Sequence, residues 1–127
     1  MKVYIAGPMT KYRDSNYNFP EFYKAQSLLE MIGYTVHNPA RMDIESGKAQ
    51  FAPFEGRIVT APDFTLADAM RRDIKVIAEC DAIVLLPDWE SSKGAAMELH
   101  VAKNIFQMPV FVLTVNDGGW PVLTRQE

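Results

Sequence analysis

The sequence predicts an α/β fold in a single domain, residues 1–127, with a parallel sheet of about five strands and helices on both faces. Short apolar runs rich in β-forming residues alternate along the chain with segments whose apolar residues recur at helical spacing. This alternation favours parallel strands, because a crossover through a helix joins strands that point the same way. The expected arrangement is three-layered, α/β/α, as in Rossmann-like and flavodoxin-like folds.

The expected strands are short and bounded by turn-forming residues. Apolar runs predict strands over residues 2–6, 34–37, 82–86 and 109–115. The run at 82–86 has no polar interruption, which is typical of a strand buried on both faces.

The expected helices have recognisable starts. Asn18, with Glu21 three residues later, predicts a helix that begins with Asn18 as its N-cap and ends at Gly33. A second helix is predicted from Thr65 to about residue 79, and a third from Gly94 to about residue 106.

Ligands in such sheets bind beyond the carboxyl ends of the strands, where the strand order reverses. The loops expected to form a site are therefore residues 7–17, 38–62 and 87–94. Residues 41–62 have no clear period and contain several glycines and prolines, so we expect an ordered cover over the site.

Composition narrows the function classes. A net charge of −3 argues against a nucleic-acid polymer as partner, although a single nucleotide needs only a few local donors. One cysteine, Cys80, and two histidines cannot build a disulfide or a Cys/His zinc site, so we expect no metal and no cofactor. Cys80 is interpreted as a small core residue. We expect a cytoplasmic protein without a membrane segment.

Two carboxylates lie on apolar helix faces. Residues three and four positions apart share a face, and Asp73 and Glu98 each have small or apolar residues at these spacings. The charges beside Asp73, including Arg71 and Arg72, are expected on other faces. Burying a carboxylate is costly, so the pattern indicates a function. The alternative is that each carboxylate caps a loop amide or forms an internal ion pair.

The pair is typical of glycosyl-transfer chemistry. An ionised carboxylate can attack an anomeric carbon, and a second carboxyl can give the leaving group a proton. Glu98 stands about one turn inside its helix, so the helix dipole is expected to help keep it ionised. No Ser-His-acid or Cys-His set indicates acyl transfer.

The segment that enters the third helix could hold an anion. Ser91, Ser92 and Gly94 offer hydroxyls and backbone N–H groups at a helix start, and Lys93 adds charge. The alternative is that a serine simply caps the helix.

These residues together resemble a known family. Tyr4-Ile5-Ala6-Gly7, Asp73, and Ser92-x-Gly94-x-Ala96-x-Glu98 resemble, in order and spacing, the nucleoside 2-deoxyribosyltransferase superfamily over most of the chain. The chain is most similar to a small branch that is common in phages and bacteria.

The resemblance implies roles for individual residues. Glu98 matches the glutamate that attacks C1′ and holds a covalent deoxyribosyl intermediate, and Asp73 matches the aspartate that assists the departing base. Tyr4 matches a tyrosine that positions the glutamate, and Gly7 matches a glycine that lets the substrate approach. Ser92 resembles the serine of 2′-deoxynucleoside 5′-monophosphate N-hydrolases, where transferases of free nucleosides carry an acidic residue.

The expected function is therefore cleavage or exchange of the N-glycosidic bond of a 2′-deoxynucleoside 5′-monophosphate or deoxynucleoside. Two alternatives stay open: cleavage of an NAD- or ADP-ribose-type nucleotide, and nucleotide binding without turnover. The resemblance also implies a homodimer or larger homo-oligomer with shared sites. Phe54 and Trp89 are candidates for stacking on a base, with a core or interface role as the alternative.

Overall fold

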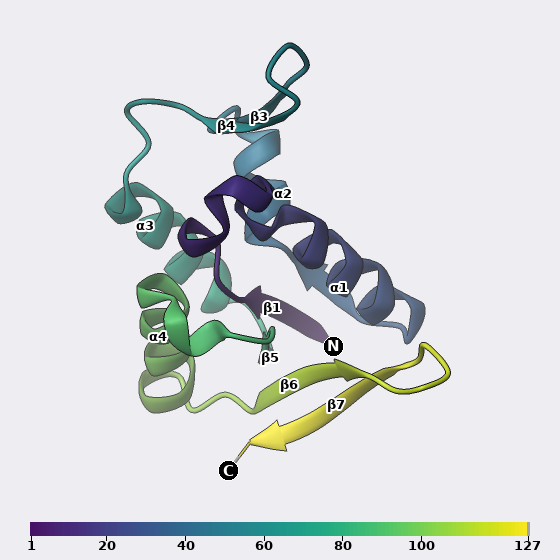
Figure 1. The fold of residues 1–127 in the computed structure, drawn as a ribbon. Coiled ribbons are helices and arrows are strands. Elements are labelled where there is room, and N and C mark those ends of the chain that lie inside the picture. The colour runs from purple at the N-terminus through teal and green to yellow at the C-terminus, as the bar shows by residue number, and fades with distance from the viewer. Residues whose placement is uncertain (127) are drawn as a thin grey trace.

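The computed structural model describes residues 1–126, which form a mixed α/β domain (Figure 1). Its main sheet has five strands in the order β2-β1-β5-β6-β7. The first four are parallel and β7 runs antiparallel to β6, so the predicted sheet is confirmed as mostly parallel. The strands are β1 (Lys2–Ala6), β2 (Thr35–His37), β5 (Ala82–Leu85), β6 (Val110–Val115) and β7 (Pro121–Gln126).

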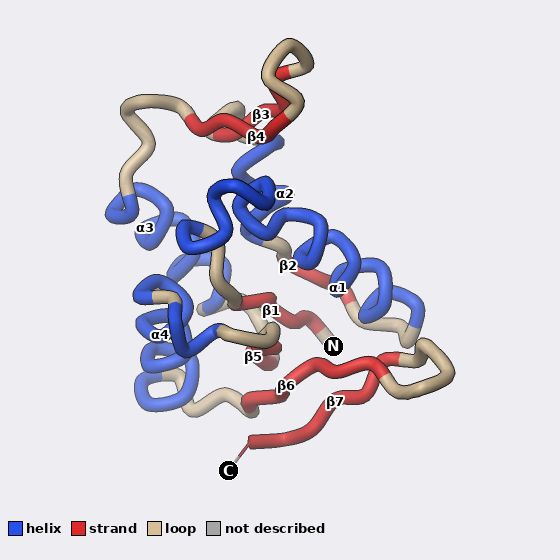
Figure 2. The backbone as a smooth tube through the Cα atoms, in the orientation of Figure 1, coloured by secondary structure: helices blue, strands red, loops and turns tan. Residues whose placement is uncertain are grey.

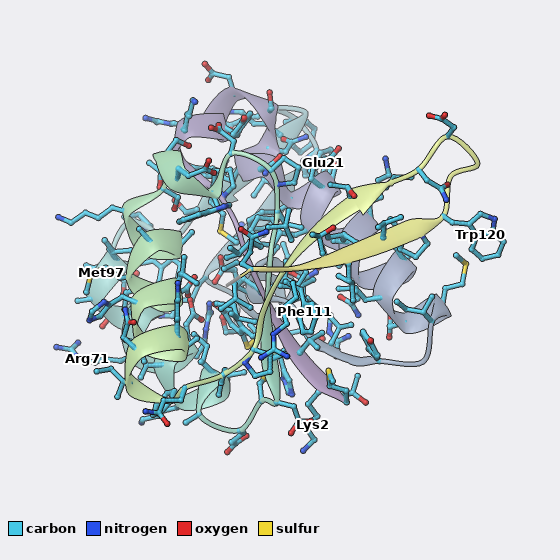
Figure 3. All side chains as sticks on the ribbon, turned by 90° about the horizontal axis from the view of Figure 1, so that it is seen from below. Lys2, Glu21, Arg71, Met97, Phe111 and Trp120 are labelled. Atoms are coloured by element: carbon cyan, nitrogen blue, oxygen red, sulfur yellow. The ribbon has the colours of Figure 1, made fainter. Side chains whose placement is uncertain are left out.

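Strand β7 was not expected, because the sequence prediction ended its last strand at Val115. A turn at Asn116 makes the hairpin: its Oδ1 accepts hydrogen bonds from the backbone N–H groups of Gly118 (2.9 Å) and Trp120 (3.0 Å). Trp120 is 59% exposed and stands at the outer end of this hairpin (Figure 3). The antiparallel return therefore adds an edge strand to the sheet beside β6.

Helices occupy most of the connections between strands (Figure 2). The expected loop after β1 is largely a 3₁₀ segment, and the third expected helix ends in a π-helical turn. No helix within residues 1–126 is long and apolar enough to cross a bilayer. The helical segments are η1 (Thr10–Asn18), α1 (Phe19–Met31), α2 (Pro39–Glu45), α3 (Leu66–Ile77), η2 (Trp89–Ser91), α4 (Lys93–His100) and η3 (Val101–Ile105).

The start of α1 differs from the prediction. Asn18 precedes the helix but adopts a left-handed conformation (φ 63°), and its side chain makes no capping hydrogen bond. Its Nδ2 instead donates to the carbonyl oxygen of Pro8 at 3.0 Å. The predicted N-cap position is therefore confirmed, but the Asn18 side chain ties the end of η1 to the loop after β1 instead of capping the helix.

Two core clusters lie on opposite faces of β1. Val3 and Ile5 pack in one cluster with Leu29 of α1, while Tyr4 packs in the other with Ala95 of α4. Successive side chains of a strand point to opposite faces, so α1 and α4 lie on opposite sides of β1 (Figure 1). This alternation turns Tyr4 towards the two helices that carry the predicted carboxylates.

The segment expected to be an irregular cover contains regular structure. After α2 it forms an antiparallel pair, β3 (Ala49–Ala52) and β4 (Arg57–Thr60). Phe54, at the tip of this pair, is fully exposed. The backbone N–H of Ile58 donates to Oδ1 of Asn16 at 3.0 Å, which joins β4 to η1.

Candidate functional site

A cavity of about 650 Å³ opens beyond the carboxyl ends of β1, β2 and β5. The loop after β1, helices α2 and α3, and the start of α4 all contribute to its wall. β1 lies between β2 and β5, so the chain leaves β1 and β5 in opposite directions across the sheet at this point. The cavity thus lies where an α/β sheet is expected to bind its ligand.

Six of the seven residues predicted for the site line this one cavity. They are Gly7, Asp73, Ser91, Ser92, Gly94 and Glu98. Tyr4, the seventh, is fully buried and contacts the site through Glu98. Helical spacing had predicted that both carboxylates face inward, and each of them is only 5% exposed.

Tyr4 and Glu98 form a short, buried hydrogen bond. The Tyr4 hydroxyl donates to Oε2 of Glu98 at 2.6 Å. Tyr4 comes from β1 and Glu98 from the second turn of α4, so the bond fixes this carboxyl against the sheet. Such a bond orients the carboxyl towards the cavity and takes up one of its acceptor positions.

The surroundings of Glu98 oppose the ionised form that its position near the start of α4 was expected to favour. Burial, followed by the charge of Asp73 and a hydrogen bond to it, raises the pKa of Glu98 well above its ordinary value. The hydrogen bond from Tyr4 and the charge of Arg72 lower that pKa only in part. Desolvation and a like charge raise the pKa of a carboxyl because both disfavour its ionised form.

Arg72 bridges two carboxylates and was expected to lie on another face of its helix. Its Nε and Nη2 lie 3.0 Å and 2.9 Å from Oδ1 of Asp73, and its Nη1 lies 2.7 Å from Oδ1 of Asp43. Its neighbour Arg71 does point to solvent, with a side chain 75% exposed (Figure 3). The long arginine side chain reaches round α3 to the buried charges, so Arg72 lines the cavity.

Asp43 is a site residue that the sequence analysis missed. It is 6% exposed and lines the cavity from α2. Burial raises its pKa to about 6, although contact with Arg72 acts in the opposite direction. The 2.7 Å contact with Arg72 lacks hydrogen-bond geometry, so the buried Oδ1 has no hydrogen-bond partner. Its place in an apparently aperiodic segment gave no pattern that could identify it.

The start of α4 combines a helix cap with the cavity wall. Oγ of Ser92 accepts from the backbone N–H of Ala95 at 3.1 Å, so the capping alternative holds for this serine. The Ser91 hydroxyl donates to the carbonyl oxygen of Asp88 at 2.8 Å. Helix geometry leaves the N–H groups of Lys93 and Gly94 without intrahelical acceptors, and both residues line the cavity.

Packing requires a glycine at position 7 but not at position 94. A Cβ on Gly7 would lie 3.0 Å from Cβ of Leu86, so packing against Leu86 explains this glycine before any substrate is considered. A Cβ on Gly94 would lie 3.5 Å from Cδ1 of Leu66, which is an ordinary contact. Gly94 is therefore dispensable for packing and leaves space at the cavity wall.

The loops after β1 and β5 are tied together through Asp88. Asp88, in a left-handed conformation (φ 68°), accepts from Lys11 Nζ at 2.9 Å and from the Tyr12 hydroxyl at 2.8 Å. These hydrogen bonds, that from Lys11 first, lower the pKa of Asp88. The predicted stacking candidates Phe54 and Trp89 do not line the cavity, whereas aromatic side chains that do are Tyr17, Phe19 and Phe64.

Within residues 1–126, no three His, Cys, Asp or Glu side chains gather so that they could hold a metal ion. Arg72 lies between Asp43 and Asp73 and supplies the positive charge there.

Comparison with protein families gives a match over most of the chain. The family described as "Domain of unknown function (DUF4406)" matches residues 1–111. The chain belongs to the DUF4406 family. The matched region holds every residue that lines the cavity and ends within β6, so β7 lies outside the part that defines DUF4406. No curated protein matches the chain.

Proposed function

We propose that this DUF4406 protein cleaves or exchanges the N-glycosidic bond of a 2′-deoxynucleoside 5′-monophosphate or deoxynucleoside through a covalent deoxyribosyl–Glu98 intermediate. One observation carries the proposal. Two carboxyl groups, Asp73 and Glu98, are each 5% exposed at the wall of one cavity, and a buried tyrosine hydroxyl orients one of them. A retaining glycosyl transfer needs two carboxyl groups beside the substrate, one as the nucleophile and one as the acid and base.

The chemical step uses both groups. The Glu98 carboxylate attacks C1′, the bond from C1′ to the base nitrogen breaks, and its electron pair leaves with the base. The base takes a proton from Asp73. Water or a second base then attacks C1′, the bond between C1′ and Glu98 breaks, and the proton of the attacking group returns to Asp73.

The raised pKa of Glu98 fits this division of roles. Glu98 keeps its proton at pH values where an exposed glutamate is ionised, so the proton must leave before the carboxylate attacks. Asp73 is the neighbouring carboxyl that can receive it, and Arg72 holds Oδ1 of Asp73 in place. Transfer of this proton from Glu98 to Asp73 leaves Glu98 ionised as the nucleophile and Asp73 protonated as the acid.

The start of α4 supports a phosphorylated substrate. The Ser92 oxygen accepts the capping bond, which leaves its hydroxyl hydrogen to donate to an anion. The first-turn N–H groups and Lys93, which lines the cavity, favour negative charge at the same end, whereas the charge of Lys11 is already paired with Asp88. The serine at position 92 does not repel a phosphate, whereas a carboxylate at this position would repel it.

The same proposal includes the layer arrangement, the oligomeric state and the cellular location of the protein. The core clusters on the two faces of β1 support a three-layer, Rossmann-like arrangement of the kind found in the nucleoside 2-deoxyribosyltransferase superfamily. The exposed apolar side chains of Met97 and Ile105 support a homodimer or larger assembly with shared sites. We place this protein in the cytoplasm.

The decisive experiment follows base release by liquid chromatography. Wild type, Glu98→Gln and the exposed control Glu79→Gln are incubated with each 2′-deoxynucleoside 5′-monophosphate and nucleoside, with and without a second base. Base release by wild type and the control only, with a deoxyribosyl adduct on Glu98 in the acid-quenched protein, supports the proposal. Release from ribonucleotides or NAD alone would favour the second glycosidase alternative, and binding without any release would favour the non-catalytic one.

A second variant tests the phosphate assignment. Ser92→Asp keeps a good N-cap, so α4 remains intact, but it places a carboxylate where the phosphate is proposed to bind. We expect kcat/KM for monophosphates to fall at least ten-fold while free nucleosides lose less. An equal loss for both substrate types contradicts a phosphate contact at Ser92.

A further inference from the structure

We propose that Asp43 and Phe64 form the base-binding end of the cavity and select bases that carry an exocyclic amino group at the ring position where uracil and hypoxanthine carry a carbonyl. This inference rests on the proposed function and adds the substrate class of the same site.

The contacts set an order along the cavity. The anion-favouring end is the start of α4, with Ser92 and Gly94, and the reacting groups are Glu98 and Asp73. Arg72 contacts both Asp73 and Asp43, and Asp43 lies on α2 after β2, on the other side of β1 from β5 and α4. A nucleotide with its phosphate at α4 and C1′ at Glu98 directs its base towards this far end.

Asp43 has unused acceptor capacity at this position. A carboxylate can accept about four hydrogen bonds. Among residues 1–126 its side chain makes one polar contact, in which Oδ1 lies 2.7 Å from Nη1 of Arg72, and the other oxygen, Oδ2, has no polar partner. An acceptor held in a dry wall next to a cavity favours a ligand that brings a donor, because the hydrogen bond then replaces one lost from water.

Phe64 supplies the apolar face that a base needs. The Arg72 guanidinium lies over its ring, with Cζ 6.0 Å from the ring centroid, and Phe64 also lines the cavity. The guanidinium thus connects the ring to the two carboxylates. A flat base stacks on an aromatic ring whatever its identity, so the choice among bases falls to the group at its edge.

The amino group is the edge feature that Asp43 distinguishes. Cytosine and adenine carry an amino donor where uracil, thymine and hypoxanthine carry a carbonyl acceptor. An ionised carboxylate accepts from the amino group and repels the carbonyl oxygen. A binding site rejects a substrate strongly when that substrate leaves a buried polar group of the site without a hydrogen-bond partner.

The first test needs only pairs of substrates that differ at this one group. Binding of dCMP and dUMP, and of dAMP and dIMP, is measured by calorimetry on Glu98→Gln, which keeps the cavity without turnover. Base release from the same four compounds is measured on wild type. We expect at least a ten-fold preference for the amino member of each pair in both measurements.

Variants then assign the preference to Asp43. Asp43→Asn is almost isosteric but offers both an acceptor and a donor, so we expect the preference to fall at least five-fold, with kcat/KM rising for the carbonyl substrates. Asp63→Asn, an exposed carboxyl outside the cavity, controls for the lost charge. A uniform loss on all four substrates would overturn the inference, because it indicates that Asp43 only positions Arg72.

The inference and the proposed function fail in different ways. Base release without preference between the paired substrates overturns the amino-group selection and leaves the glycosidase proposal standing. A binding preference on Glu98→Gln without base release on wild type overturns the glycosidase proposal and supports the recognition by Asp43. The absence of both binding and release overturns both.

Discussion

The Tyr4 hydroxyl donates a 2.6 Å hydrogen bond to Oε2 of Glu98, and 94 positions of sequence separate the two residues. The bond is buried and joins β1 to α4. It also lowers the pKa of Glu98, against the larger effects of burial and Asp73. One hydrogen bond thus links the framework of the sheet to the protonation of the proposed nucleophile.

Removing this hydroxyl should change stability and pH dependence together. Tyr4→Phe leaves a buried carboxyl without its donor, which we expect to cost about 1–3 kcal/mol in the free energy of unfolding. Loss of the bond also raises the pKa of Glu98 further, so the rising limb of the rate against pH should move to higher pH. Urea unfolding and the pH profile of base release check the two effects. A destabilised Tyr4→Phe variant with an unshifted pH profile contradicts the role of Tyr4 in positioning Glu98. Tyr34→Phe changes a half-buried tyrosine outside the cavity and serves as the control.

Arg72 should be far more important for stability than its neighbour. Arg72→Met removes the cation between Asp43 and Asp73, and uncompensated buried charge costs about 3 kcal/mol or more at neutral pH. Arg71→Met removes an exposed side chain that pairs with Asp68 at 3.3 Å, so its cost should stay below about 1 kcal/mol. Urea unfolding of both variants checks the contrast. Equal costs would mean that the two carboxyl groups tolerate the loss of Arg72.

The two glycines of the cavity should respond differently to one added methyl group. Gly7→Ala brings a Cβ to 3.0 Å from Leu86, and we expect a loss of about 1–3 kcal/mol in stability. Gly94→Ala meets only Leu66 at 3.5 Å, so stability should be unchanged or slightly improved. The same methyl narrows the anion end of the cavity, so KM for monophosphates should rise. Thermal unfolding and steady-state kinetics separate these outcomes. A destabilised Gly94→Ala would contradict the assigned packing.

Periodicity identified the parts of the site that depend on one helix alone. Asp73 and Glu98 were predictable because residues three or four positions apart share a face whatever lies opposite. The strands before them were predictable because buried parallel strands are continuous apolar runs. Local sequence therefore located the two carboxylates and the edge of the sheet where they meet, and the structure confirms both placements.

The remaining features depend on tertiary contacts. Arg72 reaches the cavity because its side chain is long and two buried carboxyls attract it, which no face of α3 reveals. Asp43 joins it because α2 packs beside the site, although its segment appears aperiodic. The raised pKa of Glu98 likewise reflects burial and Asp73, which the position of Glu98 on its helix does not reveal.

Asp43 should make stability fall as the pH rises. Burial places its pKa at about 6, above the ordinary 3.8, with Arg72 and Asp73 as the charged groups that act on it. A carboxyl whose pKa is raised by folding stabilises the folded state when protonated, so the contribution is complete below about pH 4 and lost as the pH passes about 6. A shift of about two pKa units corresponds to about 3 kcal/mol. Asp43→Asn cannot titrate, so we expect its stability relative to wild type to improve by about this amount between pH 4 and pH 7. Urea unfolding at four pH values measures the difference, with Asp63→Asn as the control for charge. Parallel curves of the free energy of unfolding against pH for wild type and Asp43→Asn would show that Asp43 has the same pKa in the folded and unfolded chain.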